Sequence, residues 1–297
     1  MSPYGRPKGE FPPQGDGAAR QGGGMKHEVQ GREAYVYTGG KVFDASLPCV
    51  VFVHGALHDH SVWALLARWC AHHGYGVLAV DLPGHGRSAG PALASVEASA
   101  DWLLALLGAA GVASPGQATL VGHSMGSLIA LEAAARAPAL VGRLVMVGSA
   151  YPMKVSQALL DTARDAPLQA IDRVNAFSIS TLAAKPSFPG PGMWLHGSNR
   201  ALMRRTLNGP NAAGNAINLF HHDFSVCDAY ANGLQAAASV TAKATLVLGT
   251  MDQMTAPRAT RDLATALNAK TVLLPSGHSL QAEVPEGLLE ALRGALA

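Results

Sequence analysis

The chain has 297 residues, of which 48% are hydrophobic and 14% are charged, and its formal net charge is +2. This apolar content excludes intrinsic disorder over most of the length, because disorder needs low hydrophobicity and a high net charge. The near-neutral charge gives no electrostatic footprint for nucleic acid or for an anionic membrane surface. We therefore expect a folded protein that binds neither nucleic acid nor a membrane surface, and these numbers leave its oligomeric state open.

The number of cysteines and the hydropathy of the sequence indicate the cellular compartment of the protein. Cys49, Cys70 and Cys227 are too few and too scattered for a disulfide framework or a zinc module, which suits a reducing compartment. No uninterrupted apolar run reaches the roughly 18 residues that span a bilayer, and the N-terminus lacks the apolar segment of a secretory signal. These features predict a cytoplasmic protein without a membrane partner.

The first 25 residues are rich in Gly and Pro and show no apolar periodicity. They are typical of a disordered leader, and Met25 is an alternative start of translation. We expect the folded core to begin at residue 26.

From residue 33 onward, short β-rich runs alternate with longer helical patterns, which is typical of a parallel sheet with helices on both faces. The strands are expected at 35–37, 42–43, 49–53, 76–80, 118–121, 144–147, 245–248 and 271–274. The helices are expected at 62–72 with Ser61 as N-cap, then at 96–107, 125–136, 157–177, 201–207, 258–267 and from 285 to the end. The fold class is therefore α/β.

The alternation breaks over residues 151–238, which contain helical patches but no convincing central strand. We interpret this block as a helical cap inserted between two parts of one core, residues 26–150 and 239–297. Active sites of open α/β sheets lie at the carboxyl edge of the strands, and the cap is expected to cover that edge. A separately packed domain is the alternative.

The residues Gly122-His123-Ser124-Met125-Gly126 form a G-x-S-x-G motif between a predicted strand and a predicted helix. In this context the motif is typical of a tight turn that exposes a nucleophilic serine above the sheet. The glycines leave room for a strained backbone, and the N-terminus of the following helix favours developing negative charge. Ser124 is therefore the predicted nucleophile.

A serine hydroxyl needs a base that is itself oriented by an acid. In enzymes with this turn the partners follow in the order Ser, acid, His. Asp252 and His278 each follow a predicted strand of the same sheet, so both can reach Ser124 at one edge. The loop after 144–147 runs Gly148-Ser149-Ala150 and offers no rival carboxylate.

Acyl-transfer chemistry also needs two backbone N–H groups aimed at the oxyanion of the tetrahedral intermediate. Met125, directly after the nucleophile, is the first predicted donor. Ala56, in the loop after the strand 49–53, is the second, and Leu57 is the less favoured neighbour. His54 is expected to support this loop rather than to take part in the chemistry.

These segments together resemble the α/β-hydrolase superfamily, in the branch of serine esterases, haloperoxidases and C–C bond hydrolases. The motifs that carry the resemblance are Val53-His54-Gly55-Ala56, Asp81-Leu82-Pro83-Gly84-His85-Gly86-Arg87-Ser88, the serine motif, Gly249–Asp252 and Gly277-His278. The resemblance covers about residues 33–150 and 240–297. It implies an eight-stranded, mostly parallel sheet and an activity that needs no cofactor, while the cap carries most of the substrate choice.

The resemblance favours cleavage of carboxylic esters through an acyl-enzyme and leaves several alternatives open. Haloalkane dehalogenases and epoxide hydrolases of this fold use an aspartate at the position of Ser124. C–C hydrolases commonly show Asn where this chain has His123, which lowers that alternative. Thioesterase, lactonase, perhydrolase and acyltransferase activities use the same residues. A receptor-like binding protein is the alternative outside enzymes.

A metal site is not expected. His54, His58, Asp59 and His60 form a histidine-rich run, but its spacing does not match a metallo-β-lactamase ligand motif. Pocket lining or helix capping is the preferred interpretation of His58 and Asp59. In the cap, the candidate pocket residues are Met193, Trp194, His196, Phe220, His221, His222 and Phe224. Packing within the cap is favoured for each of them, and together they indicate an apolar pocket.

Overall fold

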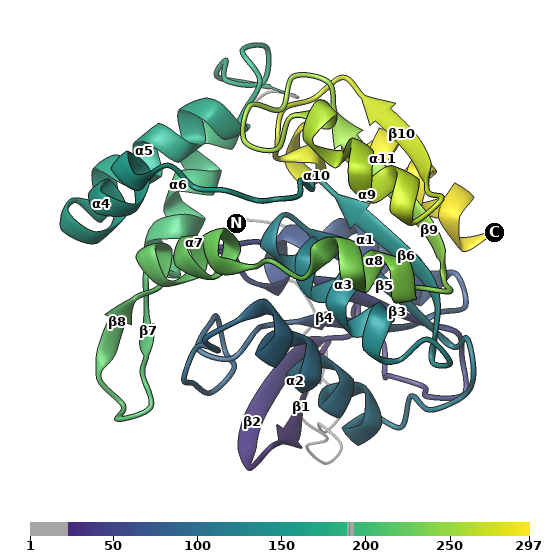
Figure 1. The fold of residues 1–297 in the computed structure, drawn as a ribbon. Helices are drawn as coiled ribbons and strands as arrows, with labels where there is room; N and C mark the ends of the chain where they lie inside the picture. The colour runs from purple at the N-terminus through teal and green to yellow at the C-terminus, as the bar shows by residue number, and fades with distance from the viewer. Residues whose placement is uncertain (1–22, 189, 191–192) are drawn as a thin grey trace, which may run out of the picture.

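The computed structural model describes residues 23–188, 190 and 193–297. Eight strands form one sheet in the order β1-β2-β4-β3-β5-β6-β9-β10 (Figure 1). Their bounds are β1 Gly24–Val29, β2 Arg32–Tyr37, β3 Cys49–Val53, β4 Gly76–Val80, β5 Ala118–His123, β6 Val141–Val147, β9 Lys243–Gly249 and β10 Lys270–Leu274. Strand β2 pairs antiparallel with β1 and β4, and all other pairs are parallel. The predicted eight-stranded, mostly parallel α/β fold is confirmed.

The central strands are buried along their whole length because helices cover both faces of the sheet. Val51 and Val53 of β3 belong to the buried cluster of one face, whereas Val50 and Phe52 belong to that of the other. The first cluster includes α2 (Val96–Ala109), α3 (Met125–Arg136), α8 (Gly233–Ser239) and α9 (Arg261–Ala266). The second includes α1 (Ala64–His72), α10 (Leu280–Glu283) and α11 (Pro285–Leu296). A strand covered on both sides has no polar face, which explains its continuous apolar run.

The start of the fold differs from the sequence prediction. Strand β1 begins at Gly24, two residues before the expected start of the core, and residues 1–22 of the predicted leader lie outside the described part of the chain. The strand expected at 42–43 is wrong, since Val42 is 97% exposed and no strand forms there. Gly39 and Gly40 both have positive φ angles and turn the chain away from the sheet at this point.

Four predicted helices also differ in detail. The helix expected at 201–207 is α6 (Leu195–Arg205), and the helix expected at 258–267 begins as a 3-10 turn, η2 (Pro257–Thr260), before α9. The helix expected at 62–72 begins as a short 3-10 turn, η1 (His60–Trp63), before α1. Its N-cap is Asp59, whose carboxylate accepts the N–H of Ser61, so the predicted cap was two residues too late. The helix expected at 157–177 is two helices, α4 (Gln157–Asp165) and α5 (Pro167–Ser178), because Pro167 has no N–H to continue the first one.

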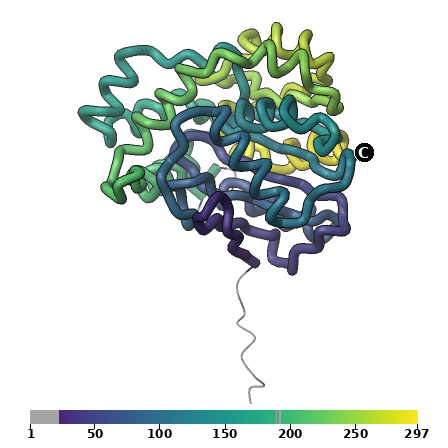
Figure 2. The backbone as a smooth tube through the Cα atoms, turned by 60° about the horizontal axis from the view of Figure 1, so that its bottom comes forward, coloured from purple at the N-terminus to yellow at the C-terminus, as the bar shows by residue number. Residues whose placement is uncertain are grey.

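We call residues 148–242, between β6 and β9, the insert. It comprises α4, α5, α6 (Leu195–Arg205), the hairpin of β7 (Asn208–Pro210) and β8 (Ala216–Asn218), α7 (Leu219–Ala229) and α8. Helices α4 to α7 gather at one side of the molecule in both views (Figures 1 and 2). They share a buried cluster that also includes Leu57 of the core. The hairpin, α7 and α8 were not expected from the sequence.

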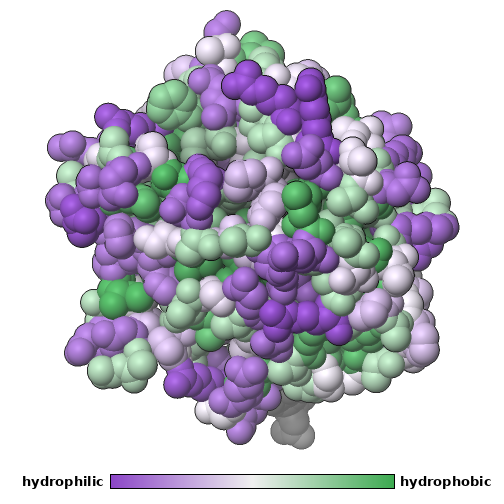
Figure 3. Space-filling model, viewed as in Figure 1, coloured by the Kyte–Doolittle hydropathy of each residue, from purple (hydrophilic) through white to green (hydrophobic). Residues whose placement is uncertain are grey.

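Figure 3 shows one face of the molecule, coloured by hydropathy. On the face seen in Figure 3, hydrophobic and hydrophilic residues are interspersed. Among the described residues, no helix has both the length and the apolar character needed to cross a membrane.

Candidate active site

The three residues predicted to form the triad lie at one edge of the sheet. Ser124 follows β5, Asp252 follows β9 and His278 follows β10. The structure brings two of them into direct contact, since His278 Nδ1 and Asp252 Oδ2 are 2.8 Å apart. Ser124 and His278 line the same cavity, and within the described residues no hydrogen bond joins Ser124 Oγ to the His278 ring.

Ser124 occupies a strained turn between β5 and α3. Its backbone has φ +51° and ψ −120°, a conformation that residues with a side chain rarely adopt. A Cβ atom at position 122 would collide with the carbonyl of Gly126, and one at position 126 with the carbonyls of Val53 and His54. Both positions of the motif therefore need glycine for close packing. Met125 is the first residue of α3, where an N–H has no acceptor within the helix.

Asp252 is held by four donors. Oδ1 accepts the N–H groups of Met254 and Thr255, each at 2.8 Å, and Oδ2 accepts the Thr255 hydroxyl at 2.6 Å as well as the His278 ring. Burial alone would raise the pKa of the Asp252 carboxyl, but His278 and the Thr255 hydrogen bonds overcome it and lower this pKa below its usual range. Asp252 is thus a carboxylate that fixes the orientation of the His278 ring.

The backbone of His278 is anchored on both sides. Its N–H donates to the carbonyl of Ser178, at the end of α5, at 2.6 Å. Its carbonyl accepts from Nε2 of His123 at 3.0 Å. Burial, and to a smaller extent the neighbouring His278 and His58, hold the pKa of His123 well below its usual value. His123, which directly precedes Ser124 in the motif, is therefore a neutral donor that positions the loop of His278.

The loop after β3 presents Ala56 to the cavity and is fixed from beneath by His54. Nε2 of His54 accepts the N–H of Leu82 at 3.1 Å, and its Nδ1 lies 2.8 Å from the carbonyl of Gly55. Burial lowers the pKa of His54 to about 4, so the ring is neutral. These contacts agree with a supporting role for His54.

The next residue of this loop, Leu57, is clamped by the insert. Leu57 is fully buried and has a positive φ of 59°, which is strained for a residue with a Cβ atom. Its N–H donates to Oδ2 of Asp223 on α7 at 2.8 Å, and its carbonyl accepts the hydroxyl of Thr206 after α6. Because this N–H is already bound, Ala56 rather than Leu57 is left to face the cavity.

Asp223 also forms a buried ion pair with His85 of the core, at 3.0 Å. Burial lowers the pKa of His85, but Asp223 outweighs burial and raises it above 6.5. Burial likewise raises the pKa of Asp223, and His85 with the Leu57 N–H outweighs it and lowers this pKa below 3.8. Other titratable groups facing the pair are His54, Asp81, His222 and Cys227.

We expect the pair to stabilise the fold most between about pH 4 and 6.5. The His85 contribution is full below its unfolded pKa and is lost as the pH rises through its raised folded pKa. The Asp223 contribution is full above its unfolded pKa and is lost as the pH falls through its lowered folded pKa. The melting temperature of Asp223→Asn should therefore fall further below wild type at about pH 5 than at about pH 9. The control is Asp172→Asn, in an exposed pair with Arg200, and a pH-independent Asp223→Asn deficit would contradict the expectation.

A cavity of about 120 Å³ opens between the core and the insert. Ala56, Ser124 and His278 line its floor, and its other walls are mainly apolar. The apolar side chains of the insert in these walls are Met153, Val155, Leu159, Val174, Met203 and Phe224. Of the seven cap residues considered from the sequence, only Phe224 is among them. Met193 and Trp194 are exposed, and Phe220 is buried within the insert.

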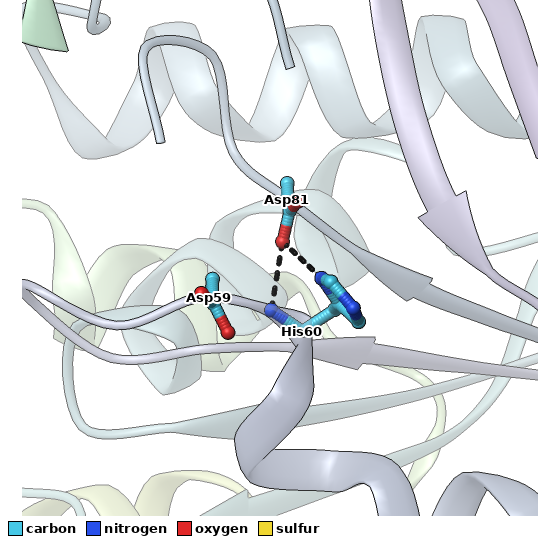
Figure 4. Close-up of side chains that lie close together, drawn as sticks. All are labelled: Asp59, His60 and Asp81. Carbon is cyan, nitrogen blue, oxygen red and sulfur yellow. Dashed lines mark hydrogen bonds and ion pairs between the residues drawn. The ribbon is translucent and has the colours of Figure 1, made fainter. Parts of the chain in front are cut away.

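One cluster has metal-binding residue types, Asp59, His60 and Asp81 (Figure 4). Asp81 accepts the backbone N–H and lies 2.7 Å from the ring Nδ1 of His60, and its second oxygen accepts the N–H of Arg87. Asp59 caps η1 through Ser61 and pairs with Arg205. The carboxylate oxygens are already bound to protein donors, so the cluster does not fit an ion. The capping interpretation of Asp59 is confirmed.

Comparison with known proteins decides the family. The sequence profile of a family described as "Alpha/beta hydrolase family" matches residues 50–291. The chain belongs to the alpha/beta hydrolase family. This hydrolase is 29% identical over 274 residues to a protein of Mycobacterium tuberculosis named as an esterase, covering 84% of this chain and 83% of that one.

Two further comparisons place this hydrolase among its relatives. It is 39% identical over 101 residues to a pimeloyl-[acyl-carrier protein] methyl ester esterase of Methylococcus capsulatus, which is 34% of this chain and 36% of that one. The crystal structure of the enol-lactonase from Burkholderia xenovorans has a TM-score of 0.75 at 20% identity and covers 92% of this hydrolase and 99% of that chain. At 20% identity, the similarity to the enol-lactonase shows a shared fold only.

Several residues around the site were missed by the sequence analysis. Thr255 carries a weak signal, since a hydroxyl three residues after a loop aspartate can bond back to it. Asp223 and Thr206 carry none, because they reach Leu57 across 166 and 149 residues of sequence.

Proposed function

We propose that this hydrolase cleaves carboxylic esters through an acyl-enzyme formed on Ser124. The observation that carries the proposal is His278, which lies 2.8 Å from Asp252 and lines one apolar cavity together with a serine on a strained turn. An acid-oriented histidine beside a serine is the arrangement that serves acyl transfer on many folds. The small-molecule substrate would enter between the core and the insert, which acts as a cap.

In the proposed mechanism, Ser124 Oγ attacks the ester carbonyl while His278 Nε2 takes its proton. Asp252 holds Nδ1–H of His278 and stabilises the imidazolium that forms. The N–H groups of Ala56 and Met125 bind the oxyanion of the tetrahedral intermediate. His278 then protonates the leaving alcohol, and a water activated by the same ring releases the acid. Catalytic hydrogen bonds often tighten only when substrate is bound. The mechanism therefore does not require a hydrogen bond between Ser124 and His278 before the substrate binds.

The relatives support ester cleavage over the alternatives. The proteins from Mycobacterium tuberculosis and Methylococcus capsulatus are both named esterases. Thioesters, lactones and C–C bonds would meet the same residues, as would an acyl acceptor other than water. Turnover rates measured with esters, thioesters, lactones and C–C substrates, and with acyl acceptors other than water, would distinguish these reactions.

Covalent labelling tests the proposal. A fluorophosphonate probe should label the protein on the peptide that contains Ser124, because only an activated serine reacts with it. Ester turnover should persist in EDTA, because the proposed mechanism uses side chains and backbone alone. The control variant is Ser239→Ala, which removes an exposed serine, and it should still be labelled on the peptide that contains Ser124. Labelling elsewhere, or loss of turnover in EDTA, would contradict the proposed function.

The hydrogen bond from the Leu57 N–H to Asp223 leads to a further expectation for kcat. Asp223→Ala removes the acceptor of the Leu57 N–H, so the neighbouring Ala56 N–H should lose its aim at the oxyanion. We expect kcat to fall by about 10- to 100-fold with little change in KM, since misplacing one oxyanion donor affects the transition state most. Asp223→Asn retains an acceptor oxygen and should lose less. Steady-state kinetics on folded variants check this, and equal losses in both variants would contradict it.

A further inference from the structure

A second cavity, of about 240 Å³, adjoins the catalytic cavity. Four residues line both cavities, namely His58, His123, Asn199 and Ser279. His58 is fixed as part of the shared wall, because its Nε2 lies 2.8 Å from Oδ1 of Asn199. Asn199 in turn donates to Oδ1 of Asn175 at 2.8 Å. The two cavities are therefore adjacent and share four lining residues.

The second cavity is lined by residues next to His278, the group that would protonate the leaving alcohol. Ala56 and Ser124 line only the first cavity, so the carbonyl carbon and the oxyanion belong there. His123 and Ser279, which flank His278, extend into the wall of the second. Since His278 must give its proton to the leaving oxygen, an alcohol released beside His278 would extend into this chamber.

The walls of this chamber combine apolar surface with one unpaired amide. Val62, Ile179, Leu195 and Leu202 supply aliphatic surface. Gln281 of α10 also lines the chamber and is 8% exposed, and within the described residues its buried Nε2 has no hydrogen-bond partner. An unpaired buried amide is costly, and a ligand oxygen would supply the missing acceptor. The terminal torsion of glutamine is soft, so the amide can turn toward such a ligand.

We propose that this second cavity binds the leaving alcohol of the substrate, and that Gln281 selects alcohols carrying a hydrogen-bond acceptor such as an ether or carbonyl oxygen. The inference rests on the proposed ester hydrolysis. A cavity of roughly 150 Å³ holds benzene, so this larger one has room for a six-membered ring. The smaller catalytic cavity is left for a short acyl chain.

A matched pair of butyrate esters tests the assignment. One is the ester of cyclohexylmethanol, and the other is its ring-ether counterpart, in which the ring CH₂ opposite the substituent is replaced by oxygen. The ratio of their kcat/KM values, ring ether over carbocycle, is measured for wild type and for Gln281→Leu. The ratio should fall by about two- to tenfold in the variant, the range of one net hydrogen bond. The exposed Gln235→Leu is the matched control and should keep the wild-type ratio.

A second variant tests the chamber without removing the amide. Ser198 of α6 lines the second cavity only, and Ser198→Trp should fill it. The kcat/KM of the cyclohexylmethyl ester relative to methyl butyrate should then fall at least about tenfold, because the ring loses its place.

The outcomes separate the two proposals. An unchanged ether-to-carbocycle ratio in Gln281→Leu overturns the role of Gln281. If Ser198→Trp changes how kcat/KM depends on the length of the acyl chain rather than on the alcohol, the assignment of the second cavity to the alcohol is overturned. In both cases ester hydrolysis would stand. Turnover of these esters that survives Ser124→Ala would instead overturn the proposed function itself.

Discussion

Replacing Ser124 by alanine is expected to lower kcat for ester hydrolysis by about a millionfold, the loss found when a triad serine is removed. The strained turn that holds Ser124 presents one hydroxyl to the cavity beside His278. Alanine keeps the turn but removes the nucleophile, so no acyl-enzyme can form. Initial rates with p-nitrophenyl butyrate would measure the loss.

The fold of Ser124→Ala should remain intact, which its melting temperature and circular dichroism would establish. A melting temperature close to that of wild type is expected, because alanine at position 124 keeps the backbone conformation of the turn. Activity in the variant above about one hundredth of wild type would mean that another group carries the reaction. His278→Ala should then retain activity as well.

Replacing Asp252 by asparagine is expected to lower kcat by about ten-thousandfold, although the side chain keeps its shape. Asp252 accepts from His278 Nδ1, from the Thr255 hydroxyl and from two backbone N–H groups. An amide nitrogen at the Oδ2 position would meet donors instead of accepting from them, and it would favour the wrong tautomer of His278. The imidazolium formed during attack would also lose its counter-charge.

The control for this change is Asp262→Asn, in the first turn of α9 and exposed to solvent. It removes the same charge without touching the site, and its kcat should match that of wild type. Asp252→Asn should unfold at a lower temperature than wild type near neutral pH, and the gap should close as the solution is acidified, since a lowered carboxyl pKa stabilises the folded state only above it. Retention of a tenth or more of the wild-type kcat would show that the acid lies elsewhere.

The sheet and the positions of the candidate catalytic residues could be predicted because each has a local signal. A buried parallel strand is a continuous apolar run, and the loop that follows it must end at the carboxyl edge. Ser124, Asp252 and His278 each lie within four residues of such a strand. The regular alternation of strand and helix then places them at one edge without any knowledge of distant contacts.

The insert could not be predicted to the same depth, because its structure depends on contacts distant in sequence. Helix α7 carries Asp223 toward Leu57 and His85, yet nothing near Asp223 in the sequence distinguishes it from a solvated acid. Of the aromatic residues considered for the pocket, Phe224 lines the cavity, Phe220 is buried within the insert and Trp194 is exposed. By contrast, the break between α4 and α5 has a local signal, because Pro167 cannot continue the hydrogen bonds of the first helix.

The clamp on Leu57 has a consequence for how such an enzyme can be altered. The family resemblance implies that the insert carries most of the substrate choice. Here Asp223 and Thr206 belong to the insert but hold the backbone next to Ala56. An exchange of the insert for that of a relative would thus change the catalytic geometry together with the specificity. A chimaera that keeps both hydroxyl and carboxylate contacts to residue 57 is the design we expect to retain its rate.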